Sequence, residues 1–365
     1  MIFVSGKVHS SYRAQNIIKL ITDNNIEYSH LPFFLTIGEN YFIKRAFAII
    51  SILFLIPARV LLLIMSKKII ILPMNNTVFS LFDAFIGKIF NKEIILEFYI
   101  STYDTAVNDR GEISPNSNEA KKLLLIEKKL TQYATRIICL NEAEKNYYLN
   151  FMHPSAKNKI MSVPLVIDRV KSRNQEKTRG KNFKICWWGT YIPLHGLEKI
   201  IESIKHIEGY DITFYIFGNN EEKSKPYQHL VNELELNDQI VFNNEFTFKN
   251  GKLPEFLINN CDLALGNFGS SEKAKTVLVN KIVDTVALNL PCLTMQTKAC
   301  DEFFIANENI FLTKEDPTPE DIANAIIKII ANEDNLFKVS NSGHCVYNNY
   351  FSPEAFSKKY LPLLK

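Results

Sequence analysis

The chain has 365 residues, more than the ~250 to 300 residues at which a single hydrophobic core stops growing. Hydrophobic residues make up 47% and charged residues 22%, which excludes a disordered chain and predicts a globular protein of two domains. The net charge of +3 is too small to indicate nucleic-acid binding. The six cysteines show no C-x-x-C spacing, and most lie in apolar runs, so we expect reduced thiols in a cytosolic protein.

Strand-length apolar runs alternate along the chain with stretches of helical spacing, which is typical of parallel α/β architecture. The first run, residues 1–5, predicts a strand and has no feature of a secretion signal. In the first half we further expect strands at 69–72, 93–98 and 136–140 and helices at 77–90 and 117–133. In the second half we expect strands at 183–188, 212–217, 240–242, 263–265 and 292–294.

Residues 46–65 are almost wholly apolar and long enough to cross a bilayer as a helix. A span is disfavoured by Arg59, and Pro57 is expected to break the helix. The other interpretations are a helix in the core of the first domain and a helix on a membrane surface. No acidic residue lies between Glu39 and Asp83, which favours contact with anionic head groups. The same interval holds five basic residues: Lys44, Arg45, Arg59, Lys67 and Lys68.

The stretch 168–180 is rich in charged residues and has hardly any apolar ones, which is typical of a solvated linker. We therefore expect an N-terminal domain at 1–167 and a C-terminal domain at 181–345. The last segment, 346–365, is expected to pack as a helix back on the N-terminal domain.

The stretch 183–205 predicts an anion site. Its strand is followed by Gly189 and Thr190, and a helix begins after His195 and Gly196. A glycine turn before a helix N-terminus lets backbone N–H groups approach a phosphate, and the helix dipole adds about half a positive charge. Many α/β proteins turn in this way without a ligand, so an ordinary structural turn is the alternative. The same alternative holds for Gly218, which follows the strand at 212–217.

The stretch 263–304 holds a second candidate binding site. Its loop contains Gly269, Ser270 and Ser271 and could surround a polar ligand with backbone donors. Lysines 273, 275 and 281 follow, on and around a predicted helix that bears Asp284. Lysines supply charge opposite a diphosphate, and a carboxylate one helical turn on can accept both hydroxyls of a ribose. The alternative is a solvated, charged helix face.

Taken together, these stretches resemble the nucleotide-sugar domain of GT-B glycosyltransferases of family 4, or group 1. The family's glycine turn with a K-G or H-G pair is matched from Gly189 to Gly196, and its K-x-x-E is matched by residues 281–284. The G-x-P-V that follows is represented by residues 289–292. The first half resembles a bacterial subfamily with the pattern SxYDTxVxDR, here residues 101–110, and a serine-bearing turn, here residues 114–117. The resemblance covers roughly residues 70–345.

The resemblance implies two Rossmann-like domains whose parallel sheets face a central cleft, with a nucleoside diphosphate sugar as donor and no cofactor. It implies that Asp284 contacts the donor ribose. Thr276 replaces the glutamate that contacts the donor sugar, so this role passes to Glu272 or to the backbone of residues 269–271. Thr190 and His195 stand where the family has an arginine and a lysine, so we assign the diphosphate charge to Lys275 and Lys281.

On the acceptor side, the family's N-domain histidine has no clear match, and Asp104 and Asp109 are the best substitutes as catalytic residues. Asp109 could instead form a structural pair with Arg110. The resemblance implies retention at the anomeric carbon, in which the donor phosphate can take the proton, so no strong enzymic base is required. The sequence contains no H-E-x-x-H, paired Cys/His set or D-x-D, so we expect no metal site.

These features predict an enzyme that transfers a sugar to a growing, lipid-linked surface polysaccharide or oligosaccharide. Its partners would be the donor, the glycan acceptor and a membrane surface, with no nucleic acid. We expect it in the cytoplasm, peripheral on the inner face of the plasma membrane. Two alternatives are a nucleotide-sugar 2-epimerase of the same fold and a non-catalytic membrane-associated scaffold. The epimerase acts on a soluble substrate and would not need the basic apolar segment at 41–68.

Overall fold

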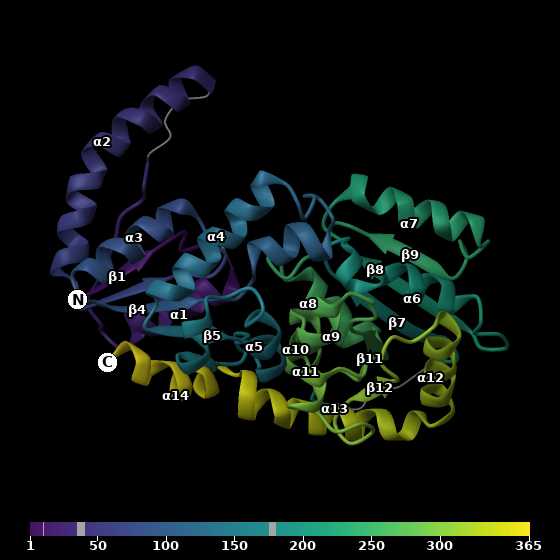
Figure 1. Cartoon of the computed structure of the whole chain (residues 1–365). Helices are drawn as coiled ribbons and strands as arrows, with labels where there is room; N and C mark the ends of the chain where they lie inside the picture. The colour runs from purple at the N-terminus through teal and green to yellow at the C-terminus, as the bar shows by residue number, and fades with distance from the viewer. Residues whose placement is uncertain (10, 35–40, 175–179) are drawn as a thin grey trace. The chain divides into compact units, whose positions relative to one another are not determined.

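The computed structural model describes residues 1–9, 11–34, 41–174 and 180–365 (Figure 1). The chain divides into two compact units, of which the first contains Met1–Val166 and Ser357–Lys365 and the second contains Ile167–Phe356. Part of the expected linker, residues 175–179, lies outside the described residues. Each unit is built around one parallel six-stranded sheet, as the alternation of strand and helix patterns predicts.

The sheet of the first unit has the strand order β2-β1-β3-β4-β5-β6. Its strands are β1 (Ile2–Ser5), β2 (Tyr28–His30), β3 (Lys68–Ile71), β4 (Glu93–Glu97), β5 (Arg136–Cys139) and β6 (Ile160–Ser162). Its helices are α1 (Tyr12–Asp23), α2 (Tyr41–Met65), α3 (Val78–Ile89), α4 (Asn118–Tyr133) and α5 (Glu142–Tyr148), with shorter turns η1 (Asp104–Asp109) and η2 (Pro154–Asn158).

The sheet of the second unit has the order β12-β11-β10-β7-β8-β9. Its strands are β7 (Phe183–Trp188), β8 (Ile212–Phe217), β9 (Ile240–Asn243), β10 (Leu263–Leu265), β11 (Cys292–Met295) and β12 (Phe311–Thr313). Its helices are α6 (Leu197–Ile204), α7 (Glu221–Glu233), α8 (Lys252–Asn260), α9 (Glu272–Thr276), α10 (Asn280–Ala287), α11 (Lys298–Asp301), α12 (Pro319–Ala331) and α13 (Leu336–Val346). Short turns are η3 (Pro193–His195), η4 (Glu333–Asn335) and η5 (Tyr347–Phe351).

Every expected strand is present, and the sequence analysis missed three: β2, β6 and β12. Each of these has only three residues and lies at the edge of its sheet. An edge strand is covered on fewer sides, so it needs no continuous apolar run and leaves a weak signal. The expected helices at 77–90 and 117–133 begin one residue later, because Thr77 and Ser117 are N-caps whose hydroxyls accept backbone N–H groups.

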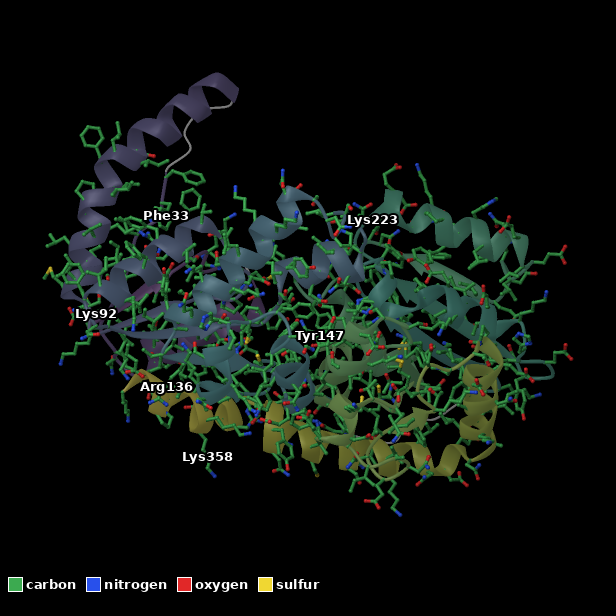
Figure 2. The ribbon with its side chains drawn as sticks, in the orientation of Figure 1. Phe33, Lys92, Arg136, Tyr147, Lys223 and Lys358 are labelled. Atoms are coloured by element: carbon green, nitrogen blue, oxygen red, sulfur yellow. The ribbon has the colours of Figure 1, made fainter. Side chains whose placement is uncertain are left out.

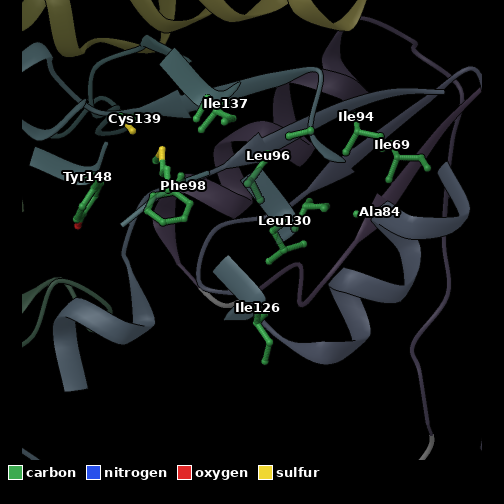
Figure 3. Packing of buried hydrophobic residues seen from close by; sticks show 14 of the residues in the cluster. Ile69, Ala84, Ile94, Leu96, Phe98, Ile126, Leu130, Ile137, Cys139 and Tyr148 are labelled. Carbon is green, nitrogen blue, oxygen red and sulfur yellow. The ribbon is translucent and has the colours of Figure 1, made fainter. Parts of the chain in front are cut away.

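The core of the first unit follows from the burial of a parallel sheet on both faces. Ile69, Ile94 and Ile137 come from three neighbouring strands and are completely buried (Figure 3). Ile126 and Leu130 of α4 pack against this layer. The apolar runs of the sequence therefore correspond to strands covered by helices.

Two arginines are buried in the first unit, and each is paired with a carboxylate. Arg13 of α1 donates from Nε to Glu97 at 2.9 Å, and also to the carbonyl oxygens of Val163 and Pro164. Arg59 of α2 donates from Nε to Asp83 of α3 at 2.7 Å. Both arginine side chains are about 1% exposed. A buried ion pair positions its elements because either charge alone would be left without compensation.

The expectation that Pro57 breaks the helix at 46–65 is wrong, because α2 is continuous from Tyr41 to Met65. Figure 1 shows it as a bent helix. A proline removes one backbone hydrogen bond and more often bends a helix than ends it when packing holds both sides. Here the turn after Pro57 is held by Arg59. The side chains of residues 41–50, which include Lys44 and Arg45, lie outside the described part of the structure.

Over the described residues, no helix combines the length and the hydrophobicity that a bilayer span requires. The last helix, α14 (Pro353–Leu364), begins later than the expected segment 346–365, and residues 357–365 belong to the first unit. There Tyr360 is completely buried, with the Arg13 guanidinium 5.5 Å from its ring centroid. All six cysteines are free, and five of them are buried.

We predict that Asp83→Asn lowers the free energy of unfolding by about 3 to 5 kcal/mol, because it leaves the buried Arg59 cation without its counter-ion. Urea denaturation checks this value. The matched control is Glu354→Gln, which removes a carboxylate from an exposed pair with Arg169 and should change stability little. Equal effects of the two substitutions would contradict a structural role for the buried pair.

Candidate functional site

The strand order of the second unit creates a switch point between β7 and β10. The chain starts at β7, adds β8 and β9 on one side, and then crosses back to add β10, β11 and β12 on the other. Loops that leave β7 and β10 therefore run in opposite directions from the carboxyl edge of the sheet. In open α/β sheets this crevice is where ligands bind. The two candidate loops of the sequence analysis, after Trp188 and after Leu265, are the loops that leave these strands.

The loop after β7 is shaped by glycines. Gly189 follows the strand directly, and Thr190 is exposed at the turn. Gly196 precedes α6 with a positive φ of 61°, and a Cβ atom there would lie 2.5 Å from the carbonyl group of Phe268. Glycine is therefore required at position 196 for its backbone conformation and for the close approach of the second loop.

The loop after β10 packs directly on the first loop. The backbone N–H of Phe268 donates to the carbonyl oxygen of His195 at 3.2 Å. A Cβ atom on Gly269 would lie 2.1 Å from the carbonyl oxygen of Leu194. Ser271 then caps α9 by accepting the N–H of Ala274. The two loops thus form one rigid structure in which their backbones touch.

Lys281 is unusual for a lysine because its side chain is almost completely buried. It lies on α10, is 4% exposed, and its Nζ has no hydrogen-bond partner within the described chain. The ammonium group is 3.9 Å from the ring centroid of Trp187, and a Cβ on Gly189 would be 3.4 Å from it. Burial lowers the pKa of Lys281 well below its usual value. A buried lysine without an acidic hydrogen-bond partner is a candidate for contact with an anion.

His195 lies in the same place. An added Cβ on Gly189 would lie 3.5 Å from its ring, and its ring makes an edge contact with Trp187. Over the part of the chain that is described, the Nδ1 atom of His195 and the Nε1 atom of Trp187 also lack hydrogen-bond partners. Burial, together with nearby Lys281, lowers the pKa of His195 well below 6.5, so it is neutral at pH 7. Three residues beside the Gly189 turn, Trp187, His195 and Lys281, therefore each have a buried side-chain nitrogen atom without a hydrogen-bond partner among the described residues.

Asp284 lies one helical turn after Lys281 and is partly exposed. Trp188 donates from Nε1 to its carboxylate at 3.4 Å. Burial raises the pKa of Asp284 to about 7, although the Trp188 hydrogen bond and the Lys281 charge act in the opposite direction. We call Gly189, His195, Lys281 and Asp284 the switch-point site. Its parts are a glycine turn, a buried cation and a carboxylate at the carboxyl edge of one sheet.

The sequence of the second unit belongs to a recognised family. Residues 168–344 match the family described as glycosyl transferases group 1. This match covers just under half of the chain and identifies the second unit as a group 1 glycosyltransferase domain. A comparison with curated protein sequences finds no match.

Solved structures resemble the glycosyltransferase over its whole length. HepE of Anabaena in complex with UDP-glucose gives a TM-score of 0.70 at 13% identity, covering 100% of this chain and 98% of that one. Sucrose-phosphate synthase of Thermosynechococcus elongatus gives 0.69 at 12% identity, covering 99% and 97%. The lipopolysaccharide outer core galactosyltransferase WaaB, in its apo form, gives 0.66 at 11% identity, also covering 99% and 97%. The expected GT-B fold is confirmed.

Other predicted donor residues of the glycosyltransferase have different surroundings. Lys275 pairs with Glu272 at 3.2 Å, and the Glu272 side chain is 73% exposed. Thr276 donates to the backbone of α9. Gly218 lies beneath Tyr191, since a Cβ there would be 2.1 Å from the Tyr191 hydroxyl. The structure therefore places Lys281 at the Gly189 turn and pairs Lys275 with Glu272 on α9.

Ser270 belongs to a network that the sequence analysis missed. Lys199 of α6 donates to Ser270 at 2.8 Å and forms an ion pair with Asp316 at 2.7 Å. Ser270 donates to the same Asp316 oxygen at 2.8 Å. These contacts tie the loop after β10 to α6, and no sequence signal connects residues 117 positions apart. Trp187 and Trp188 were also missed, although two tryptophans directly before Gly189 mark the end of a strand with aromatic side chains.

In the first unit, the predicted acceptor residues lie in and after the loop that leaves β4. Asp104 is completely buried in η1 and accepts hydrogen bonds from Tyr147 at 2.5 Å and Asn108 at 3.0 Å. Asp109 is partly exposed, and Arg110 pairs with Glu112 at 3.6 Å. Contact of Asp104 with an acceptor stays a prediction, and it would require this loop to move.

Glu127 of α4 holds the start of the same loop by hydrogen bonds. Its buried carboxylate accepts hydrogen bonds from Ser101 at 2.7 Å, from Asn76 at 2.9 Å and from the N–H of Thr102. Burial raises the pKa of Glu127. The subfamily pattern at residues 101–110 therefore begins at a serine, Ser101, that is held by a hydrogen bond to a buried carboxylate.

We predict that Gly196→Ala lowers the free energy of unfolding by about 2 to 5 kcal/mol, since it combines left-handed strain with overlap against Phe268. Gly209→Ala is the matched control, because Gly209 also has a positive φ but has open space around it. The control should lose only about 1 to 2 kcal/mol. Denaturant titration of both variants measures the difference, and equal losses would remove the argument from loop contact.

We also predict that Asp284→Asn stabilises the protein at pH 8 relative to wild type, and much less at pH 5. The folded pKa of about 7 exceeds the ordinary 3.8, so the folded state retains a proton that the unfolded state has released. Wild-type stability therefore falls as pH rises from about 4 to 7, by about 1.4 kcal/mol for each unit of pKa difference. Unfolding curves of both proteins at the two pH values test this. An unchanged difference between pH 5 and 8 would show that Asp284 is not protonated in the folded protein.

Proposed function

We propose that the glycosyltransferase transfers a sugar from a nucleoside diphosphate sugar, with UDP as the nucleotide, to a lipid-linked surface glycan. The observation that carries this proposal is the buried Nζ of Lys281, which lies without a hydrogen-bond partner in the described chain beside the Gly189 turn. HepE was solved with UDP-glucose and with UDP, which supports the choice of nucleotide. The match of residues 168–344 to the group 1 glycosyltransferase family supports glycosyl transfer as the reaction.

In this proposal, Lys281 faces the diphosphate of the donor. Burial disfavours the ammonium form of Lys281 in the empty protein. The negative charge of a bound diphosphate would favour that form again. The backbone N–H groups at the start of α6 add further donors, because Gly196 begins that helix without a side-chain cap. These groups are held in place before the donor arrives and stabilise the charge that develops on the departing diphosphate. The proposal requires no metal or other cofactor.

Asp284 is proposed to bind the ribose. Its carboxylate is partly exposed beside Lys281 and accepts two hydroxyl hydrogen bonds when it is ionised. The donor sugar would then lie toward the loop at 269–271 and Glu272, which replace the glutamate expected at Thr276. Transfer with retention forms a bond between the acceptor oxygen and the anomeric carbon as the bond to phosphate breaks, and the acceptor proton moves to a phosphate oxygen.

The acceptor and the cellular location follow from weaker observations. WaaB acts on the lipopolysaccharide outer core, as its name states, and it shares this fold. A lipopolysaccharide or capsule glycan is therefore the proposed acceptor class. The basic, acid-poor segment before Asp83 favours a protein peripheral on the cytoplasmic face of the plasma membrane.

A thermal-shift screen across UDP, GDP, CMP and dTDP sugars tests the donor. A ligand at 100 times its dissociation constant should add ~2.7 kcal/mol of stability, which is easily measured. We expect stabilisation by a UDP sugar, and by none of the others to the same extent. An epimerase would convert the donor without an acceptor, whereas a transferase consumes it only slowly by hydrolysis. No stabilisation by any of the four would contradict the proposal and favour the scaffold.

We predict that Lys281→Met weakens UDP binding by at least roughly tenfold and leaves uridine binding almost unchanged, because uridine lacks the diphosphate. Methionine fits an apolar surface against Trp187, so the protein should remain folded. Lys275→Met is the matched control, since that lysine is paired with Glu272 on the surface of α9. Calorimetric titration with both ligands gives the result. Equal loss of UDP and uridine affinity would place Lys281 away from the diphosphate.

A further inference from the structure

Helix α3 is packed with its polar side inward. Its buried residues are small or polar: Ser80, Asp83, Ala84 and Gly87. Several of its large apolar side chains are exposed instead: Val78, Phe85 and Ile89 are 48%, 47% and 57% exposed, whereas Leu81 and Ile86 pack against the core. A surface helix of a globular protein normally has the opposite arrangement.

Helix α2 repeats this arrangement. Arg59 points inward to Asp83 of α3, next to the buried Leu63. Leu53 and Phe54 are 69% and 76% exposed, and Leu61 and Met65 are also exposed. The buried ion pair therefore joins the inner sides of the two helices and leaves both outer sides apolar.

The two helices are adjacent, and aromatic contacts connect them. Phe33 lies where they meet (Figure 2), with the Arg59 guanidinium 3.6 Å from its ring centroid and the Phe79 ring at 4.5 Å. We define the outer apolar face as the six exposed side chains Leu53, Phe54, Leu61, Phe79, Phe85 and Ile89. Single exposed apolar residues are common, but a group on two adjacent helices marks an interaction surface.

The charges around the outer apolar face identify the occupant. From residue 40 to residue 92 the only acidic side chain is Asp83, which is buried. Lys67 and Lys88 are exposed at the carboxyl ends of α2 and α3. An apolar centre with a cationic margin matches a bilayer that carries anionic head groups. A symmetric contact with a second copy would bring the same cations together, which is unfavourable.

We propose that the outer apolar face docks on an anionic lipid bilayer, with α2 and α3 both lying in the interface and Lys67 and Lys88 at the head groups. This assigns the membrane contact to two helices, α2 and α3, that are held together by Arg59 and Asp83. It rests on the proposed function only for the identity of the membrane, the cytoplasmic face of the plasma membrane. The helices lie on the bilayer and do not cross it.

Co-sedimentation with vesicles tests the proposal. The variant Phe54→Ser, Phe85→Ser, Ile89→Ser should bind vesicles of phosphatidylcholine and phosphatidylglycerol at least roughly tenfold more weakly than wild type, because apolar burial is lost. The matched control is Tyr210→Ser, Val241→Ser, Ile305→Ser, which removes three exposed apolar side chains from the second unit. The control should bind as wild type does. Equal binding by both variants, or no binding by wild type, would overturn the proposal.

A second arm tests the charges. Lys67→Gln with Lys88→Gln should weaken binding to vesicles that contain phosphatidylglycerol and leave binding to pure phosphatidylcholine unchanged. Sedimentation velocity without lipid addresses the other occupant: a wild-type dimer that the apolar triple variant dissociates would overturn the proposal in favour of a second copy. UDP-sugar binding, measured in parallel, separates the two proposals. Vesicle binding without UDP-sugar binding would leave the docking face standing and remove the proposed donor.

Discussion

The central position of β7 is the constraint on which the functional part of the structure depends. Since the second unit begins in the middle of its sheet, the chain must add strands on both sides, and the loops after β7 and β10 must separate. Their backbones nevertheless touch, because Gly196 lies against Phe268 and Gly269 lies against Leu194, where a larger residue would overlap. The arrangement of the two loops is therefore fixed by contacts between their backbones.

Lys281 is the buried basic side chain beside these two loops. A lysine that is almost fully buried and lacks an acidic hydrogen-bond partner in the described chain is unfavourable in the empty protein. The face of Trp187 compensates in part through its quadrupole, and Asp284 contributes from one helical turn away. Burial therefore disfavours the ammonium form of Lys281 in the empty protein. In the proposed function, the diphosphate of the donor supplies the missing negative charge.

Buried polar groups organise the first unit in a different way. Arg59 and Asp83 hold α2 against α3, while Glu127 holds the start of the loop after β4 to α4. Each removes a charge from the surface and joins elements that are far apart in sequence. For α2 and α3 the result is an outer surface that is unusually apolar for a helix pair in a protein with no spanning helix over its described residues. In the loop after β4, a separate hydrogen bond from Tyr147 holds the completely buried Asp104.

The sequence by itself determined the two parallel sheets, the approximate starts of the helices near Thr77 and Ser117, and the placement of Lys281 and Asp284 one helical turn apart. These features depend on periodicity or on contacts within one turn, which the order of residues specifies directly. It could not determine that Lys281 is buried while Lys275 stays partly exposed, because burial depends on which elements pack against each lysine. It also could not show that α2 continues through Pro57, or that Arg59, Lys199 and Asp104 find partners 24, 117 and 43 residues away. Such partners meet only when sheets and helices have packed, and only then is it decided which charge is compensated and which is left for a ligand.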